Sequence, residues 1–181
     1  RVKEVYEHPG IMLSKEDKKL LENTYKSFVR GGANLSDEDK QLYREYTNEL
    51  SSLTLKFAQN SLAATNAFSY NITRAEQVEE LPAFVKEGLA MEAKARGEKG
   101  WTVTLKAPSY VPFMTYSSQR DIKEKLWKAY NSRALGGEFD NSDNIRRITT
   151  LRLQIARLLG YNCHADYVLD NRMAQNTPTV M

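Results

Sequence analysis

Apolar residues recur at steps of three and four along most of the chain, which is the spacing of an amphipathic helix. The longest such stretch is Asp37–Ala67, in which Leu42, Tyr46, Leu50 and Phe57 belong to one stripe and no Gly or Pro intervenes. At 1.5 Å per residue this stretch predicts a helix of roughly 45 Å, longer than most globular helices. A helix of that length needs packing partners along its whole course.

Start and stop signals predict several further helices. Ser14 followed by Glu16 and Asp17 is typical of a helix start, and Gly31 and Gly32 are expected to end that helix. Other helices are expected from Pro82 to about Arg96, over 110–116 with entry through Pro112, over 119–134, from a cap at Asn141 or Ser142 to Leu159, and over 164–173. Capping signals at Thr73–Glu76 and at Thr177-Pro178 predict two short helical turns.

Two short segments alternate between apolar and polar residues as strands do. They are Phe68–Ile72 and Trp101–Leu105, and we expect them to pair. The predicted fold class is therefore mainly α, with a minor two-stranded antiparallel β element that depends on helix packing.

The length of 181 residues suits one compact domain or two small ones. A subdivision into 14–97, with the long helix, and 98–181, with a strand and the C-terminal helices, is the expected one. The chain begins at Arg1 without an initiator Met, and a helix start lies three residues from its end. Both features predict that it is a piece of a longer polypeptide.

Charge and composition exclude several classes of protein. The net charge is +3, and the second half of the chain carries the excess of Lys and Arg, but these mostly alternate with Asp and Glu. That pattern favours a solvated helix face over nucleic-acid binding. No apolar run approaches the roughly 20 residues needed to cross a bilayer. The lone Cys163 excludes an internal disulfide and leaves cytoplasm and periplasm both open.

Candidate chemistry is sparse. The two histidines, His8 and His164, have no partners at metal-ligand spacing, and the sequence has no HExxH, no G-x-S-x-G and no phosphate-binding glycine motif. His164 is expected to cap or pack a helix. The sequence therefore predicts no catalytic and no metal-binding residue in this chain.

Ten tyrosines are the other unusual feature. A tyrosine suits a helix-packing seam or a groove that accepts peptide, because its ring is apolar and its hydroxyl is polar. Tyr110 and Tyr116 flank Pro112, and irregular proline-bounded segments often line clefts. For these two residues both interpretations stay open.

Four stretches, taken in order, resemble a known family. They are LSSLTLKF at 50–57 with Asn60 and Ala67-Phe68, VTL at 103–105 with PSY at 108–110, AYNSR at 129–133, and LRL at 151–153 with ARLLGY at 156–161 and ADYVL at 165–169. From about Leu13 to Met181 this order is similar to the thimet oligopeptidase/neurolysin family of zinc metallopeptidases. The likeness is greatest to its peptidyl-dipeptidase branch, the dipeptidyl carboxypeptidases (Dcp).

The resemblance implies a mostly helical peptidase with two lobes around a deep channel that admits short, unfolded peptides. Zinc in that family is held by the HExxH pair and a distal Glu, none of which this sequence contains. The chain is therefore expected to be a non-catalytic helical lobe of a peptidyl-dipeptidase that releases C-terminal dipeptides. Alone it should bind no zinc and cleave nothing, and the apolar face it shares with the catalytic lobe could make it self-associate. Tyr110, Tyr116 and Arg133 are expected to face the channel or the seam between the lobes.

A different class of function is also open. The long helix Asp37–Ala67 could form a coiled coil or bind a partner helix, making the chain an interaction module. Its mixed steps of three and four favour a globular core over a heptad seam. Neither a nucleic-acid nor a membrane partner is expected.

Overall fold

The computed structural model describes residues 1–10 and 12–181 and divides them into two compact units. The first unit contains residues 1–53 and 147–181, and the second contains residues 54–146. These limits differ from the 14–97 and 98–181 subdivision expected from the sequence. The reason is that two helices, α3 and α7, each cross a unit limit, whereas the sequence argument placed its limit at a glycine turn. That the chain is part of a larger lobe stays a prediction.

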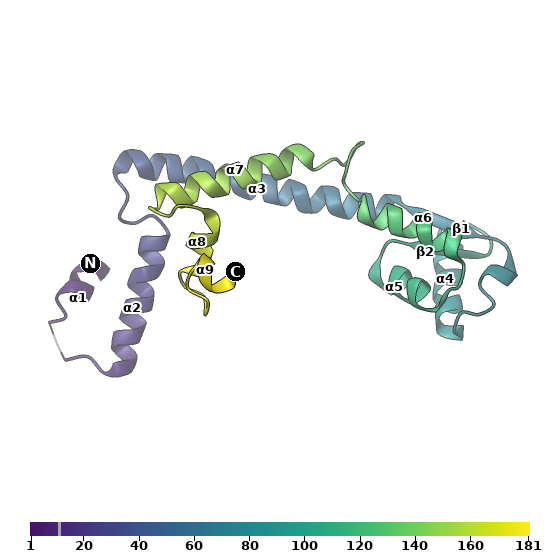
Figure 1. Cartoon of the computed structure of the whole chain (residues 1–181), viewed down its shortest axis with the longest axis horizontal. Coiled ribbons are helices and arrows are strands. Elements are labelled where there is room, and N and C mark those ends of the chain that lie inside the picture. Colours follow the sequence, from purple (N-terminus) through teal and green to yellow (C-terminus); the bar gives the residue numbers. More distant parts are fainter. Residues whose placement is uncertain (11) are drawn as a thin grey trace. The chain divides into compact units, whose positions relative to one another are not determined.

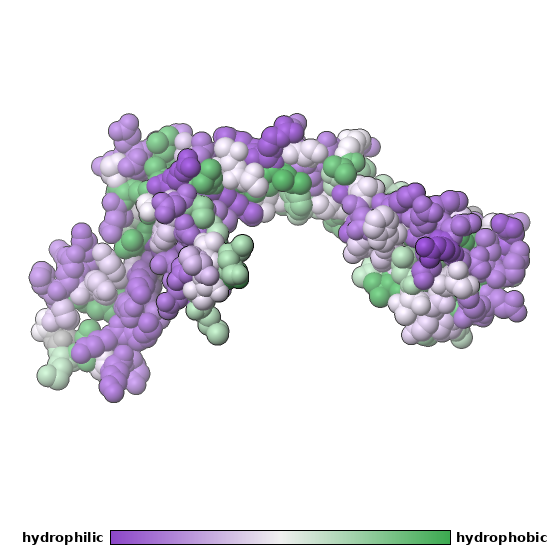
Figure 2. Space-filling view, in the orientation of Figure 1, coloured by the Kyte–Doolittle hydropathy of each residue, from purple (hydrophilic) through white to green (hydrophobic). Residues whose placement is uncertain are grey.

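The first unit is built from helices (Figure 1). They are α1 (Val2–Glu7), α2 (Lys15–Arg30), the beginning of α3 (Asp37–Ala67), most of α7 (Ser142–Leu158), α8 (His164–Leu169) and α9 (Thr177–Val180). Ser14 caps α2 as predicted, because its Oγ accepts the Asp17 backbone N–H at 3.0 Å. Hydrophilic side chains cover most of the visible face of α2 (Figure 2), and no residue of this helix is fully buried.

The second unit combines helices with the two strands. It contains the end of α3, β1 (Ser69–Ile72), a 3₁₀ turn at Ala75–Gln77, α4 (Ala83–Ala95), β2 (Trp101–Thr104), α5 (Ala107–Tyr116), α6 (Arg120–Asn131) and the first residues of α7. The mainly helical fold class and the small antiparallel sheet are thus confirmed. The described residues hold no helix long and apolar enough to cross a membrane.

The strands pair in the antiparallel direction that the sequence predicted. Ser69 lies opposite Thr104 and Ile72 lies opposite Trp101. Gly100 makes this register possible, since it has a positive φ of 84° and a Cβ there would lie 2.2 Å from the Ile72 carbonyl oxygen. Only a residue without a side chain fits this position.

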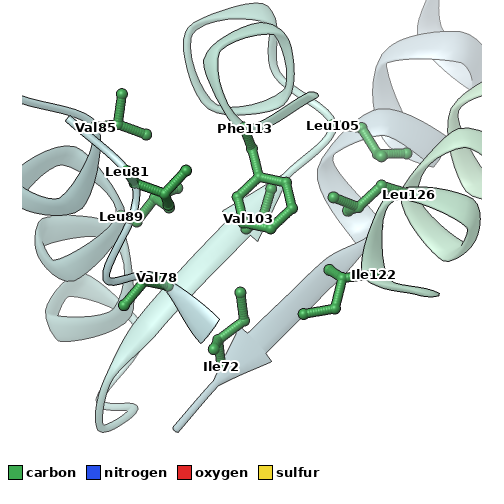
Figure 3. Close-up of a cluster of buried hydrophobic side chains, with 10 residues drawn as sticks. All are labelled: Ile72, Val78, Leu81, Val85, Leu89, Val103, Leu105, Phe113, Ile122 and Leu126. Carbon is green, nitrogen blue, oxygen red and sulfur yellow. The ribbon is translucent and has the colours of Figure 1, made fainter. Parts of the chain in front are cut away.

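The hydrophobic core of the second unit lies around β2 (Figure 3). Phe113 of α5 packs over Val103, with residues of α4 on one side and residues of α6 on the other. The buried cluster consists of Ile72, Val78, Leu81, Val85, Leu89, Val103, Leu105, Phe113, Ile122 and Leu126. Helices from both sides therefore supply the packing that a two-stranded sheet needs.

The long helix has the predicted limits, and four other details differ. Helix α5 begins at Ala107 with Pro108 in its first turn, so Pro112 lies inside the helix and is not its entry. The signal at Thr73–Glu76 gives a 3₁₀ turn capped by the backbone of Arg74. Helix α8 ends at Leu169, and Asn176, not Thr177, caps α9 through its side chain. At α5 and α9 a neighbouring residue, Pro108 or Asn176, offers a start as good as the predicted one.

Candidate functional site

The end of α6 places the first two candidate residues. Ile122 and Leu126 are buried in the core, so Tyr130, one turn further on, faces the same side of the helix. Tyr130 is partly buried and packs against the core cluster together with Tyr110 of α5. Arg133 follows directly after α6, within one turn of Tyr130.

Tyr130 joins Tyr110 and Arg133 into one stack. The Tyr110 and Tyr130 rings are parallel within 14°, with centroids 4.2 Å apart. The guanidinium carbon of Arg133 lies 3.7 Å from the centroid of the Tyr130 ring, as in a cation–π contact. We call Tyr110, Tyr130 and Arg133 the aromatic–arginine stack.

Hydrogen bonds fix Arg133 within this stack. Its Nε donates to the Tyr130 carbonyl oxygen at 2.8 Å, and its Nη1 donates to Thr65 Oγ1 of α3 at 3.3 Å. The first bond occupies a carbonyl at the C-terminal end of α6, where a positive charge is also favoured by the helix dipole. The guanidinium is therefore held by groups from two helices.

Tyr116 lies apart from the stack. It makes an edge-to-face contact with Phe84 of α4, with ring centroids 6.2 Å apart, and about half of its surface is exposed. The structure thus brings together two of the three predicted residues, Tyr110 and Arg133. Whether any of the three faces a channel stays a prediction.

Sequence reasoning did not select Tyr130, which connects the other two. The signal was present, since Tyr130 continues the stripe Ile122–Leu126 and lies three residues before Arg133. A tyrosine at such a position suits a packing seam or a groove, and the sequence does not show which ring contacts the arginine. Here the same ring packs on the core and carries the arginine.

The surroundings set the charge of the stack. Burial raises the pKa of the Tyr110 hydroxyl, the neighbouring Tyr130 raises it further, and the positive charge of Arg133 opposes both effects. The Tyr110 hydroxyl therefore keeps its proton at neutral pH. Among the described residues no carboxylate lies within ion-pairing distance of Arg133.

An open hollow of about 370 Å³ lies beside the stack within the second unit. Its walls include Ala64 and Ala67 of α3, Arg133, and Glu138 of the loop before α7. Phe68 and Phe139 add apolar surface. The volume falls within the range of small-ligand sites, roughly 300–1,000 Å³.

The described residues offer no ligand set for zinc. No three His, Cys, Asp or Glu side chains come together among residues 1–10 and 12–181. His164 begins α8 beside the Tyr167 ring, and burial, helped by the charge of Arg152, lowers the pKa of its imidazole. Helix α8 is preceded by Cys163 at the cap position, so His164 is a packing residue and not a cap.

Comparison with known proteins tests the resemblance to zinc metallopeptidases that the sequence suggested. Residues 113–181 match the sequence profile of Peptidase family M3. Oligopeptidase A of Haemophilus influenzae is 36% identical over 169 residues, which cover 91% of this chain and 25% of that protein. The chain is thus related to the M3 peptidases. Dipeptidyl carboxypeptidase of Escherichia coli, 29% identical over 168 residues (90% of this chain, 24% of that protein), and saccharolysin of Saccharomyces cerevisiae, 24% identical over 169 residues (93% and 23%), agree.

These figures agree with the resemblance to this family and differ from the expected branch. The chain spans about a quarter of the length of the curated M3 peptidases that it matches. Identity to oligopeptidase A, at 36%, exceeds identity to dipeptidyl carboxypeptidase, at 29%. The expected greater likeness to the peptidyl-dipeptidase branch is therefore not supported by the identities.

Proposed function

We propose that this chain is a helical part of a zinc-dependent M3 peptidase that cleaves short peptides. The observation that carries the proposal is the extent of the match, since 91% of the chain aligns with an oligopeptidase at 36% identity. The part played by the chain is to shape the substrate channel and to support the catalytic lobe. Packed helices can supply a secluded cavity for chemistry whose reactive groups lie elsewhere.

In this proposal the zinc ion is bound by residues of the peptidase that lie outside residues 1–181. A bound zinc ion supplies an activated water and polarises the scissile carbonyl. The residues of this chain orient peptide and exclude water. Tyr110, Tyr116 and Arg133 are proposed to do this at the channel or at the seam between the lobes, and the partly buried aromatic–arginine stack supports the idea for two of them.

The position of the cleaved bond is a finer part of the proposal. Release of C-terminal dipeptides was the expectation from the resemblance, and the higher identity to oligopeptidase A favours cleavage within oligopeptides. Mass spectrometry of the products of one decapeptide separates the two. Dipeptides removed one after another from the C-terminus would support the first, and internal cleavage would support the second.

Kinetics of the complete peptidase test the role of the three residues. Tyr110→Ala, Tyr116→Ala and Arg133→Ala are made in the parent protein, with Arg120→Ala as a control on an exposed arginine of α6. The proposal predicts a changed KM or kcat for at least one of the three and none for the control. Unchanged peptide kinetics in all three variants would remove these residues from the channel.

A second function has one observation in its favour. Leu55 and Leu62 of α3 are 60% and 62% exposed and lie seven residues apart, on one face of the helix. Such a face could bind a partner helix or a second copy of the chain. Sedimentation velocity tests binding of a second copy: a dimer at micromolar concentration that Leu55→Glu and Leu62→Glu abolish would favour an interaction module of this kind, and a monomer would dismiss self-association through this face.

A further inference from the structure

Two arginines of the described chain are partly buried, and only one of them contacts a carboxylate. Arg30 of α2 donates from Nη1 to the Asp170 carboxylate at 2.7 Å and from Nη2 to the Tyr167 carbonyl oxygen. Arg133 has a carbonyl and a hydroxyl as partners but no carboxylate. The other arginines are exposed, where water solvates the charge. Arg133 is thus the partly buried arginine of the described chain that has no counter-charge in contact.

Burial of a positive charge without a negative partner is unfavourable. The face of the Tyr130 ring and the C-terminal end of α6 compensate only part of the charge. A guanidinium carries five N–H donors, and the bonds to Tyr130 and Thr65 use two of them. Donors that match a carboxylate therefore remain on a side chain whose position is already fixed.

The hollow beside Arg133 gives a ligand access to these donors. Ala64 and Ala67 leave room at its wall, and Phe68 and Phe139 offer apolar surface next to the charge. Glu138 also lines the hollow but lies outside ion-pairing distance of Arg133. This arrangement suits a ligand with one carboxylate beside an apolar group.

We propose that Arg133, positioned by Tyr130 and Thr65, binds the carboxylate of a short peptide in this hollow. The inference rests on the proposed function, because it takes a peptide as the ligand. The carboxylate could be the free C-terminus or an acidic side chain. An arginine binds both by paired, charge-assisted hydrogen bonds.

Titration of the isotope-labelled chain with three acetylated dipeptides shows whether the bound carboxylate is a free C-terminus or an acidic side chain. The probes are N-acetyl-Ala-Phe, its C-terminal amide, and N-acetyl-Glu-Phe amide, and the readout is the NMR shift of the Arg133 Nε–Hε signal. The proposal predicts saturable binding of the first probe and none of the plain amide. Binding of the third probe as well would extend the site to acidic side chains, and equal binding of acid and plain amide would overturn the proposal.

Two substitutions with opposite expected effects complete the test. Arg133→Gln should weaken binding of N-acetyl-Ala-Phe about tenfold or more, since a hydrogen bond to a charged group is lost. Glu138→Gln should strengthen binding about two- to fivefold, because a competing negative charge is removed. Arg120→Gln, on an exposed arginine at the start of α6, should change nothing.

A purely structural role of Arg133 as a helix cap gives a different result. Arg133→Lys keeps the charge at the end of α6, so it also serves if the Gln variant does not fold. The proposal predicts binding at least about threefold weaker in this variant, because the planar fork is lost. Lys and Gln variants that fold and bind like the unchanged chain would show that Arg133 is a cap only. That result would leave the peptidase proposal standing, since the latter is tested by activity of the parent protein.

Discussion

At the scale of single residues, Asn141 shows how one amide can organise a unit. Its Nδ2 donates to the Phe57 carbonyl oxygen at 3.0 Å and to Ser61 Oγ at 3.2 Å, both on α3. Its Oδ1 accepts from Asn60 at 3.1 Å and from the buried Asn144 at 2.8 Å. Asn141 itself is 1% exposed. The residue thus joins the start of α7 to α3 within the second unit.

Loss of this amide should destabilise the chain measurably. Asn141→Ala leaves the buried Asn144 amide without its acceptor in a site closed to water, which costs about 1–3 kcal/mol, whereas the Phe57 carbonyl keeps the hydrogen bond from Ser61 Oγ. Urea denaturation followed by circular dichroism measures the change in the free energy of unfolding. Asn66→Ala, at an exposed position of α3, is the control and should stay within about 0.5 kcal/mol. Equal stability of the two variants would contradict the role given to Asn141.

A second prediction concerns the pH dependence of stability. Hydrogen bonds from Ser118 and Ser117 lower the pKa of the Glu80 carboxyl, so the folded chain favours its ionised form. A lowered folded pKa stabilises the chain above the unfolded value of about 4.3. This contribution is lost as the pH falls through the lower, folded value. In Glu80→Gln the loss of stability between about pH 5 and pH 3 should therefore be smaller than in the unchanged chain. Glu79→Gln is the control and should lose stability as the unchanged chain does. The same pH dependence of stability in Glu80→Gln and the unchanged chain would refute the role given to the Glu80 carboxylate.

At this scale the sequence pointed to single residues but not to their partners. Tyr110 and Arg133 were selected from sequence and lie in one stack, whereas Tyr116 pairs with Phe84 instead. Asn141 was expected as a possible helix cap; it directly precedes α7, and its side chain also bonds across to α3. Contacts between residues 80 positions apart carry no local signal, which is why the sequence showed these residues and not their partners.

At the scale of elements, the tight turn before β2 depends on Gly100. Gly100→Ala forces a Cβ against the Ile72 carbonyl oxygen, at a φ that side chains rarely adopt. Gly97→Ala has a similar φ of 72° and open space around the new Cβ, so it bears only the conformational cost of about 1–2 kcal/mol. Gly100→Ala should cost about 1–3 kcal/mol more than this control in thermal or urea unfolding. Equal costs would mean that the turn can shift without strain.

Helices and strands were predicted correctly where the sequence signal was long or where two signals agreed. Helix α3 has the predicted limits because 31 residues without Gly or Pro follow an acidic, capped start. Helix α5 was predicted too short, because Pro112 was read as a start although Pro108 fills that role. The two strands were found from alternation, but their register depends on Gly100, whose close approach to Ile72 no sequence pattern reveals.

At the scale of the whole molecule, burial is unequal between the two units. The buried cluster around β2 belongs entirely to the second unit. Among the described residues of the first unit, the buried apolar ones are Ile148, Leu151, Ile155 and Ala156 of α7. Local stability follows buried apolar contact.

Hydrogen exchange should reflect this difference. Amides of β1, β2 and α4 are expected to exchange slowest, and those of α1 and α9, which have no buried residue, fastest. Exchange followed by mass spectrometry on the complete chain gives the order directly. Uniform exchange across all of these elements would contradict the assignment of the core.

In the proposed function, this chain contributes shape and peptide contacts to an M3 peptidase, and the reactive groups lie outside residues 1–181. The most direct test incubates the purified chain with zinc and an oligopeptide, measures bound metal by mass spectrometry of the native protein, and analyses the peptide products. If the proposal holds, the chain binds no stoichiometric zinc and cleaves no peptide. One zinc ion per chain, or hydrolysis that a chelator abolishes, would contradict it.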